Sequence, residues 1–231
     1  MRKTLWIAIF TAALAGSIAA ASAQEVLSAN TIGYIKRELP AGGKLITVSV
    51  PLDNMTAANN VFSNLSLAAE APVNSVVSFW DVNGQRWSGG TKGTKGWPAN
   101  VVTQIVDSGE FFFIKGPATS TLPTEVTIVG EVPADAMLVR AFTGGNNMDA
   151  LANAYPSDFV FSNSTLAARA TTNSVVSFWD ANGQRWVGGT KGTKGWPANV
   201  VTQKINATVG FFMKEAGSVT TWTNTKPYTW P

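Results

Sequence analysis

The sequence predicts an all-β protein made of two tandem homologous units, each an antiparallel β-sandwich or a barrel-like unit. Three observations lead to this prediction. Short runs rich in Val, Ile, Phe, Trp and Thr alternate with Gly, Pro and Asn, one pair of runs carries a hairpin signal, and a long segment is repeated almost letter for letter. Such spacing is typical of antiparallel sheets rather than of alternating strands and helices.

From residue 32 to residue 129 the sequence contains seven runs that we expect to form strands, each of four to six residues. They are Ile32–Arg37, Leu45–Val50, Val76–Trp80, Gln85–Ser88, Val101–Ile105, Phe111–Lys115 and Val126–Val129. Two further segments, Ala57–Phe62 and Met148–Ala154, instead favour a single helical turn.

The clearest element is a β-hairpin. Residues Asp81–Gly84 join the run VVSFW to the run QRWSG. Asn-Gly is a strong hairpin signal because both residues tolerate a positive φ angle. We therefore expect the turn at Asn83–Gly84 and an equivalent turn at Asn182–Gly183.

The repeat is the strongest feature of the sequence. Asn74–Gln104 and Asn173–Gln203 agree at 29 of 31 positions, at an offset of 99. The front parts match only in pattern, at an offset of 93, where Thr31–Val50 lies over Thr124–Thr143. A repeat of this length indicates that the chain folds as two similar units. The pattern predicts one unit at residues 24–119 and a second at residues 120–217.

The first 23 residues have the pattern of an export signal. Arg2 and Lys3 precede the apolar run Leu5–Leu14, and Ala21–Ala23 has the small-x-small pattern of a cleavage site. No other stretch approaches the roughly 18 apolar residues that a membrane helix requires. We therefore expect no transmembrane segment in the mature chain, and a location that is extracellular, at the cell surface or periplasmic.

Composition narrows the classes of function. Without the signal the chain has 15 basic and 14 acidic residues, so a nucleic acid is not the expected partner. Only 13% of residues are charged, against about 25% in typical proteins, which suits a surface partly covered by neighbours. The chain has no Cys, so no disulfide supports this exported protein.

A last strand follows the second unit, in residues 218–231. Ser218–Thr223 stands where a third unit would begin. This strand pairs either within the chain or with the sheet of a neighbouring copy, by strand addition. If it is an assembly strand, Val219, Thr221 and Trp222 carry the contact.

A Gly-Lys-Trp loop follows each hairpin, at Gly89–Pro98 and Gly188–Pro197. It is not a phosphate-binding loop, because the required Gly-Lys-Ser/Thr spacing and the following helix are both missing. Indole faces beside amines suit a sugar or an anionic polymer. The other interpretation is that the tryptophans fill the core and the lysines keep the loop hydrated. The candidate binding residues are Arg86, Trp87, Lys92, Lys95 and Trp97, with their copies Arg185, Trp186, Lys191, Lys194 and Trp196.

The sequence does not predict an enzyme. It contains neither His, the commonest general base and metal ligand, nor Cys. Asp81 opens a tight turn, where its side chain is expected to cap backbone amides. Glu110 is matched by Val209, so the repeat offers no doubled pair of carboxylates for glycoside hydrolysis. We expect no catalytic residues, no cofactor and no metal.

An ordered set of short motifs resembles a known group of proteins. These motifs are Asn30–Tyr34, Leu39–Gly42 followed by Leu45-Ile46, Gly84–Trp87, Gly109–Phe112 and Val129–Pro133. In this order they resemble the repetitive exported proteins of the Verrucomicrobia and related bacteria. The resemblance covers nearly all of the mature chain, although Gly130-Glu131 stands where Arg37-Glu38 does. It implies export and a β-rich fold, and it brings no established activity.

Two functions of different classes follow. The leading expectation is an extracellular or cell-surface structural protein that assembles with itself, such as a filament subunit that uses strand addition. The alternative is a non-catalytic protein that binds polysaccharide at two equivalent Trp/Lys sites.

Overall fold

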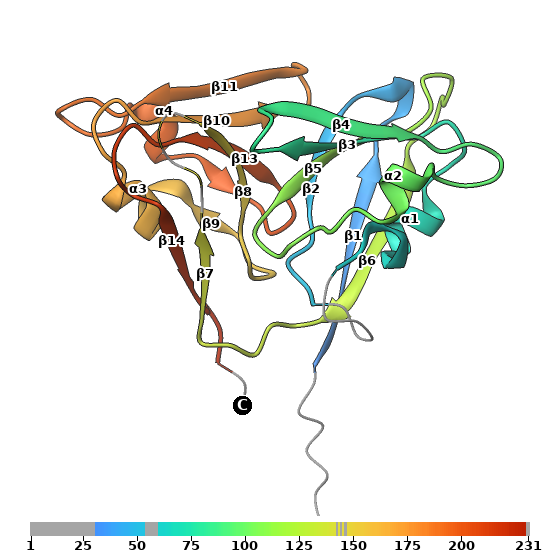
Figure 1. Ribbon diagram of the computed structural model, residues 1–231, viewed down its shortest axis with the longest axis horizontal. Helices are drawn as coiled ribbons and strands as arrows, with labels where there is room; N and C mark the ends of the chain where they lie inside the picture. The colour runs from blue at the N-terminus through green and yellow to red at the C-terminus, as the bar shows by residue number, and fades with distance from the viewer. Residues whose placement is uncertain (1–30, 54–59, 142, 144, 146, 230–231) are drawn as a thin grey trace, which may run out of the picture.

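The structure, a computed structural model, describes residues 31–53, 60–141, 143, 145 and 147–229. The expected export signal and half of the expected turn at Ala57–Phe62 lie outside these residues. The described chain is mostly strand, and every strand pair is antiparallel, which confirms the all-β prediction. Figure 1 shows two bodies side by side, which we call the first half (residues 31–131) and the second half (residues 137–229).

The first half combines a four-stranded sheet with a two-stranded ribbon. The sheet has the order β2-β5-β3-β4, and the ribbon pairs β1 with β6. The strands are β1 (Ile32–Leu39), β2 (Ile46–Ser49), β3 (Val76–Asp81), β4 (Arg86–Thr91), β5 (Phe111–Lys115) and β6 (Thr124–Glu131). The helical segments are η1 (Ala41–Gly43), η2 (Phe62–Asn64), α1 (Ser66–Glu70) and α2 (Ala99–Val102).

The second half has the matching order β8-β13-β10-β11, a ribbon of β7 with β14, and a short pair of β9 with β12. The strands are β7 (Met137–Ala141), β8 (Met148–Ala152), β9 (Phe159–Val160), β10 (Val175–Asp180), β11 (Arg185–Thr190), β12 (Lys204–Ile205), β13 (Gly210–Lys214) and β14 (Thr221–Thr225). The helical segments are η3 (Phe161–Asn163), α3 (Thr165–Arg169) and α4 (Ala198–Val201).

Two local predictions are wrong. The run Val101–Ile105 was expected as a strand, yet Ala99–Val102 forms helix α2 after Pro98, and Val101 alone is fully buried. Proline favours a helix start because its φ angle already suits the first turn. The segment Met148–Ala154 was expected as a helical turn, but Met148–Ala152 is strand β8, paired with β13. Pairing with a buried neighbour outweighs the helix propensity of its alanines.

The front parts of the two halves correspond at an offset of 103, not 93. Val48 pairs with Phe112 in the first half, and Leu151 pairs with Phe211 in the second. Strand β6, which the offset of 93 laid over β1, is instead the hydrogen-bonded partner of β1. Its residues Val126 and Ile128 pack in the core of the first half, although they fall within the predicted second unit, residues 120–217.

Each half has its own core, and a third cluster joins them. The cores lie between the four-stranded sheet and the ribbon, with inward residues such as Val77 and Phe79 of β3 alternating with Ser78 and Trp80. The opposite sheet faces meet between the halves, where Phe111, Phe113, Ala152 and Phe212 are buried and Trp80 and Trp179 pack against them. Burial on both faces explains why β5 contains three successive phenylalanines.

Candidate functional site

The first lysine of each Gly-Lys-Trp loop, Lys92 or Lys191, has a structural role. Lys92 Nζ donates hydrogen bonds to the carbonyl oxygens of Ala68, Ala69 and Ala71, at 3.0, 2.8 and 2.7 Å. Lys191 makes the same three contacts at the end of α3. A cation at a helix C-terminus satisfies the last carbonyls and the helix dipole. These two lysines are therefore helix caps and not ligand contacts.

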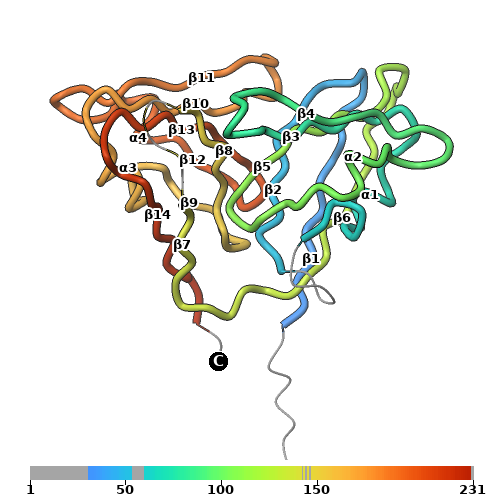
Figure 2. Tube along the Cα trace, viewed as in Figure 1, coloured from blue at the N-terminus to red at the C-terminus, as the bar shows by residue number. Residues whose placement is uncertain are grey.

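The loop tryptophans are also committed to the cores. Trp97 Nε1 donates to the carbonyl of Ala68 at 2.8 Å, and its ring meets the edge of Phe62 at 5.2 Å. Trp196 repeats these contacts with Ala167 and Phe161. The other loop lysines, Lys95 and Lys194, are exposed on loops that lie at opposite ends of the molecule (Figure 2). Each loop therefore holds its tryptophan against the core, with the first lysine 5.9 Å from the indole centroid and the second lysine in solvent.

The hairpin tryptophans, by contrast, come together. Trp87 lies 5.0 Å from Phe113 and 5.7 Å from Phe212, measured between ring centroids. Trp186 lies 5.6 and 4.9 Å from the same two rings. Both indoles also lie 6.4 Å from Phe111. We call these five rings the aromatic seam; Trp87 and Trp186 keep 39% and 37% of their surface exposed.

Reciprocal hydrogen bonds hold the seam together. Trp80 Nε1 donates to the carbonyl of Met148 at 2.8 Å, and Trp179 Nε1 donates to the carbonyl of Leu45 at 2.9 Å. Each hairpin glutamine adds a pair of bonds to the same backbone: Gln85 with Met148, and Gln184 with Leu45. Each hairpin thus binds the other half, in the manner of an isologous interface.

The hairpin turn is held by its aspartate, as expected. Asp81 Oδ1 accepts from the amides of Asn83 and Gly84, at 3.1 and 3.0 Å. A Cβ atom on Gly84 would lie 2.4 Å from the Asp81 carboxylate, so the turn needs glycine there. The amide of Gly84, followed by that of Asn83 and by Arg86, holds the pKa of Asp81 below its ordinary value.

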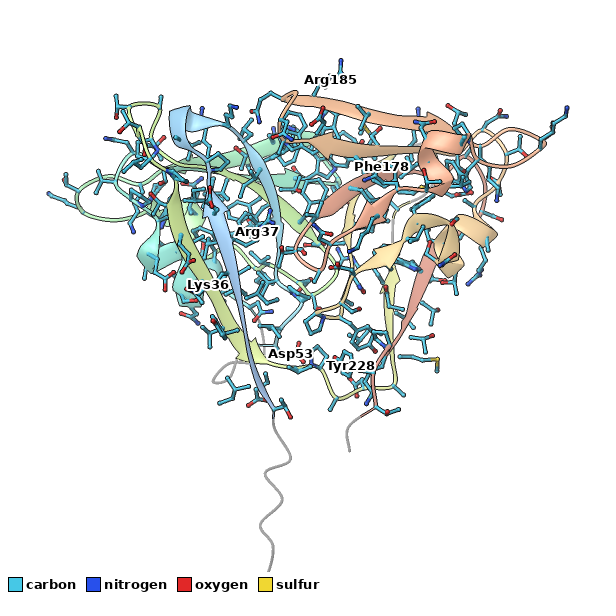
Figure 3. All side chains as sticks on the ribbon, turned by 180° about the vertical axis from the view of Figure 1, so that it is seen from behind. Lys36, Arg37, Asp53, Phe178, Arg185 and Tyr228 are labelled. Atoms are coloured by element: carbon cyan, nitrogen blue, oxygen red, sulfur yellow. The ribbon has the colours of Figure 1, made fainter. Side chains whose placement is uncertain are left out.

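The hairpin arginines are already paired with the aspartates of their own turns. Arg86 Nε is 3.4 Å from Asp81, and Arg185 Nε is 3.8 Å from Asp180. Both side chains remain largely exposed, and Figure 3 shows Arg185 pointing outward at the upper edge of the molecule. Their guanidinium groups are available to a ligand as hydrogen-bond donors.

A groove of about 670 Å³ runs beside Trp87 in the first half. Its polar lining is Asp81, Arg86, Ser88, Gln104, Asp107 and Glu110, and its aromatic lining is Phe79, Trp80 and Trp87. At the corresponding positions of the second half, Val187 replaces Ser88, Asn206 replaces Asp107 and Val209 replaces Glu110. The two sites are therefore not equivalent in chemistry.

A smaller cavity of about 300 Å³ adjoins this groove, and Trp80, Val82 and Glu110 line both. Arg140 forms an ion pair with Glu110 and lies 3.7 Å from Asp107. Burial lowers the pKa of Arg140, an effect that the neighbouring carboxylates oppose.

Asp149 also lines the smaller cavity, where its Oδ1 accepts from the amide and the hydroxyl of Thr143, at 2.9 and 3.1 Å. Two carboxylates, those of Glu110 and Asp149, therefore line one cavity. Because an arginine pairs with Glu110, the arrangement is that of an ion-pair network.

The expected assembly strand is paired within the chain. Thr221 lies opposite Ala141 in the ribbon of β7 and β14. Trp222 is buried and packs against Phe211, at 5.8 Å between centroids, while Val219 packs at the edge of the same core. The first of the two alternatives for this strand, pairing within the chain, is the one observed.

The comparisons add no relative. No family model, no curated protein and no solved structure matches this chain. Among the described residues, no group of three or more acidic side chains is placed to hold a metal ion. No helix in the described part of the chain is long and apolar enough to cross a membrane.

Sequence reasoning missed the phenylalanines of the seam and the two glutamines. Part of the signal is present in the sequence, because Phe112-Phe113 recurs as Phe211-Phe212 at the offset of 99, whereas Phe111 is matched by Gly210. A run of phenylalanines in a strand places apolar rings on both faces of the sheet. One of those faces must then be covered by something other than the unit's own core.

Proposed function

We propose that this chain is an exported, non-catalytic carbohydrate-binding protein with one composite site at the aromatic seam. The observation that supports it is the convergence of Trp87 and Trp186, one from each half, with both indoles partly open to solvent. Among the candidate residues, these two tryptophans belong to the seam, and Arg86 lines the groove beside Trp87.

The chemistry of the site suits a sugar. An indole offers a flat apolar surface for the C–H face of a pyranose ring, while polar groups at its margin take up the hydroxyls. The groove beside Trp87 supplies such groups, among them Gln104, Ser88 and the paired Arg86 and Asp81. Binding sites generally combine an aromatic wall with a few polar groups that set orientation.

Binding of the mature protein to a glycan array, followed by calorimetry on the best binder, tests the proposal. The double variant Trp87→Ala with Trp186→Ala should lose at least about tenfold in affinity, because both stacking surfaces are removed. Lys95→Ala with Lys194→Ala is the matched control and should bind as the parent does. The proposal fails if no glycan binds, or if the double tryptophan variant binds as tightly as the parent.

A second candidate function is assembly into an extracellular or cell-surface structure. Exposed apolar side chains lie on the outer faces of both ribbons, with Ile32, Tyr34 and Val129 on one and Met137 and Val139 on the other. Because the two faces differ, contact between them would be heterologous and would build a chain of copies. Strand addition through β14 would first require β14 to leave β7.

Sizing and electron microscopy of the mature protein test this second function. If assembly uses the ribbon faces, Tyr34→Lys should reduce oligomer size at a given protein concentration. A protein that stays monomeric over a wide concentration range would rule assembly out.

A further inference from the structure

We infer that the ligand of the aromatic seam is a neutral polysaccharide chain that lies across both indoles, and not a single sugar or an acidic polymer. This inference rests on the proposed carbohydrate-binding function and adds the class of ligand. Three features of the seam carry it: the spacing of the two indoles, the pairing of its charges, and the difference between its two ends.

The first feature is spacing. Trp87 and Trp186 share the neighbours Phe113 and Phe212, each within 5.7 Å of both indoles. The indoles are therefore separate surfaces that lie no further apart than the length of a short oligosaccharide. Both belong to edge strands, β4 and β11, which lie along the same edge of the molecule in Figure 1. A monosaccharide covers one indole only, whereas a polysaccharide covers both.

The second feature is charge. Arg86 pairs with Asp81, Arg185 pairs with Asp180, and Arg140 lies between Glu110 and Asp107. Each of these three arginines thus has a carboxylate partner, so they bring no excess of positive charge that would attract uronate or sulfate. Paired groups still offer donors and acceptors side by side, which is what neutral hydroxyls need.

The third feature is the difference between the ends. The end at Trp87 adjoins the groove with Ser88, Asp107 and Glu110, whereas Val187, Asn206 and Val209 stand at the matching positions beside Trp186. The end at Trp87 therefore makes more hydrogen bonds to the polysaccharide. The end at Trp186 contributes mainly stacking.

The test is a length series, from monosaccharide to hexasaccharide, of the oligosaccharide that binds best on the glycan array. Calorimetry is run with the mature protein at about 0.05 M and about 0.5 M salt, where screening lengths differ severalfold. We expect affinity to rise at least about tenfold along the series, as a second stacking contact is added. We also expect affinity to be the same at both salt concentrations.

Two single variants test which end of the seam binds the oligosaccharide more strongly. Trp87→Ala should reduce the affinity for the longest oligosaccharide more than Trp186→Ala does, while the monosaccharide should be affected only by Trp87→Ala. Equal binding of monosaccharide and hexasaccharide overturns the inference, as does a best binder that is acidic and weakens as salt rises. Either result leaves the proposed function standing, whereas an array without any binder removes the proposed function itself.

Discussion

The two halves of the molecule are alike in their hairpin-and-loop blocks, which include the contact between them, and differ elsewhere. At the contact, Trp80 and Trp179 make the same hydrogen bond to the opposite half, at 2.8 and 2.9 Å. Away from it, buried Glu215 in the second half corresponds to Gly116 in the first. A residue in a reciprocal interface serves both halves at once, which gives a physical reason for the near identity of the two hairpins.

The largest effect is expected from the tryptophans that cross between the halves. Trp80→Ala and Trp179→Ala should each lower the free energy of unfolding by about 3–5 kcal/mol, through lost packing and a lost hydrogen bond. Because the contacts are reciprocal, the two losses should agree to within about 1 kcal/mol. Urea titrations of the two variants measure this. A large loss in one variant and none in the other would contradict a shared interface.

The next effect distinguishes the halves. Glu215 is buried and accepts hydrogen bonds from Thr171 Oγ1 at 2.6 Å, from Ser174 Oγ at 2.8 Å and from the amides of Thr171 and Gly217. Glu215→Ala should cost about 3 kcal/mol, because buried donors lose a charged acceptor.

The matched control for Glu215→Ala is Gly116→Ala at the corresponding position of the first half. A Cβ atom on Gly116 would meet nothing closer than 3.7 Å, so this change should alter stability by less than about 1 kcal/mol. Thermal unfolding compares the two variants. Equal melting temperatures would show that the Glu215 network is not stabilising.

A smaller effect is expected from two equivalent serines. Both Ser75 and Ser174 are buried, yet Ser174 Oγ bonds Glu215 while Ser75 Oγ has no hydrogen-bond partner among the described residues. Ser174→Ala should therefore destabilise the protein by about 1 kcal/mol, and Ser75→Ala should be neutral or slightly stabilising. Denaturant midpoints decide the matter, and a loss on Ser75→Ala as large as that on Ser174→Ala would refute it.

The sequence was enough for the fold class because local patterns determine strands and hairpins. The hairpin at Asp81–Gly84 is an example, since its signal is contained in four residues, although the positive φ angle lies at Gln85 and not at Asn83 or Gly84 as expected. Strand pairing depends on residues that are far apart in the sequence. For this reason the sequence pattern makes β6 the equivalent of β1 in a second unit, although β6 is the hydrogen-bonded partner of β1. Apolar strands look alike in sequence whether they are equivalent in two units or paired in one.

Only the local part of the candidate site can be predicted from the sequence, again because its other contacts are non-local. Trp87 and Arg86 were recognised from the hairpin, but their approach to the second half depends on Phe212, which is far away in sequence. Lys92 is a candidate contact by sequence because the carbonyls that it caps, such as that of Ala71, are 21 residues or more away. A basic residue in a glycine-rich loop gives no local sign of such a partner.

The smallest effect concerns two carboxylates, one in each half, whose pKa values move in opposite directions. Burial, with the nearby Asp135 and Glu131, raises the pKa of Asp53, which lies close to Tyr228 at the lower end of the molecule (Figure 3). The folded state then holds this proton more tightly than the unfolded state. Stability falls as pH rises from the ordinary aspartate pKa through the raised value.

The pKa of Asp158 is shifted in the opposite direction. Its hydrogen bond with Lys204, whose Nζ lies 2.8 Å from its carboxylate, lowers the pKa of Asp158, so its contribution is present at neutral pH and is lost as pH falls. Asp53→Asn should therefore raise the melting temperature at pH 7 and leave it unchanged in acid, whereas Asp158→Asn should lower it at pH 7. Both side chains reach solvent, so each effect should be below about 1 kcal/mol. Melting curves over a pH series measure the difference, and shifts of the same sign for both variants would show that the electrostatic environments of the two halves do not differ in this way.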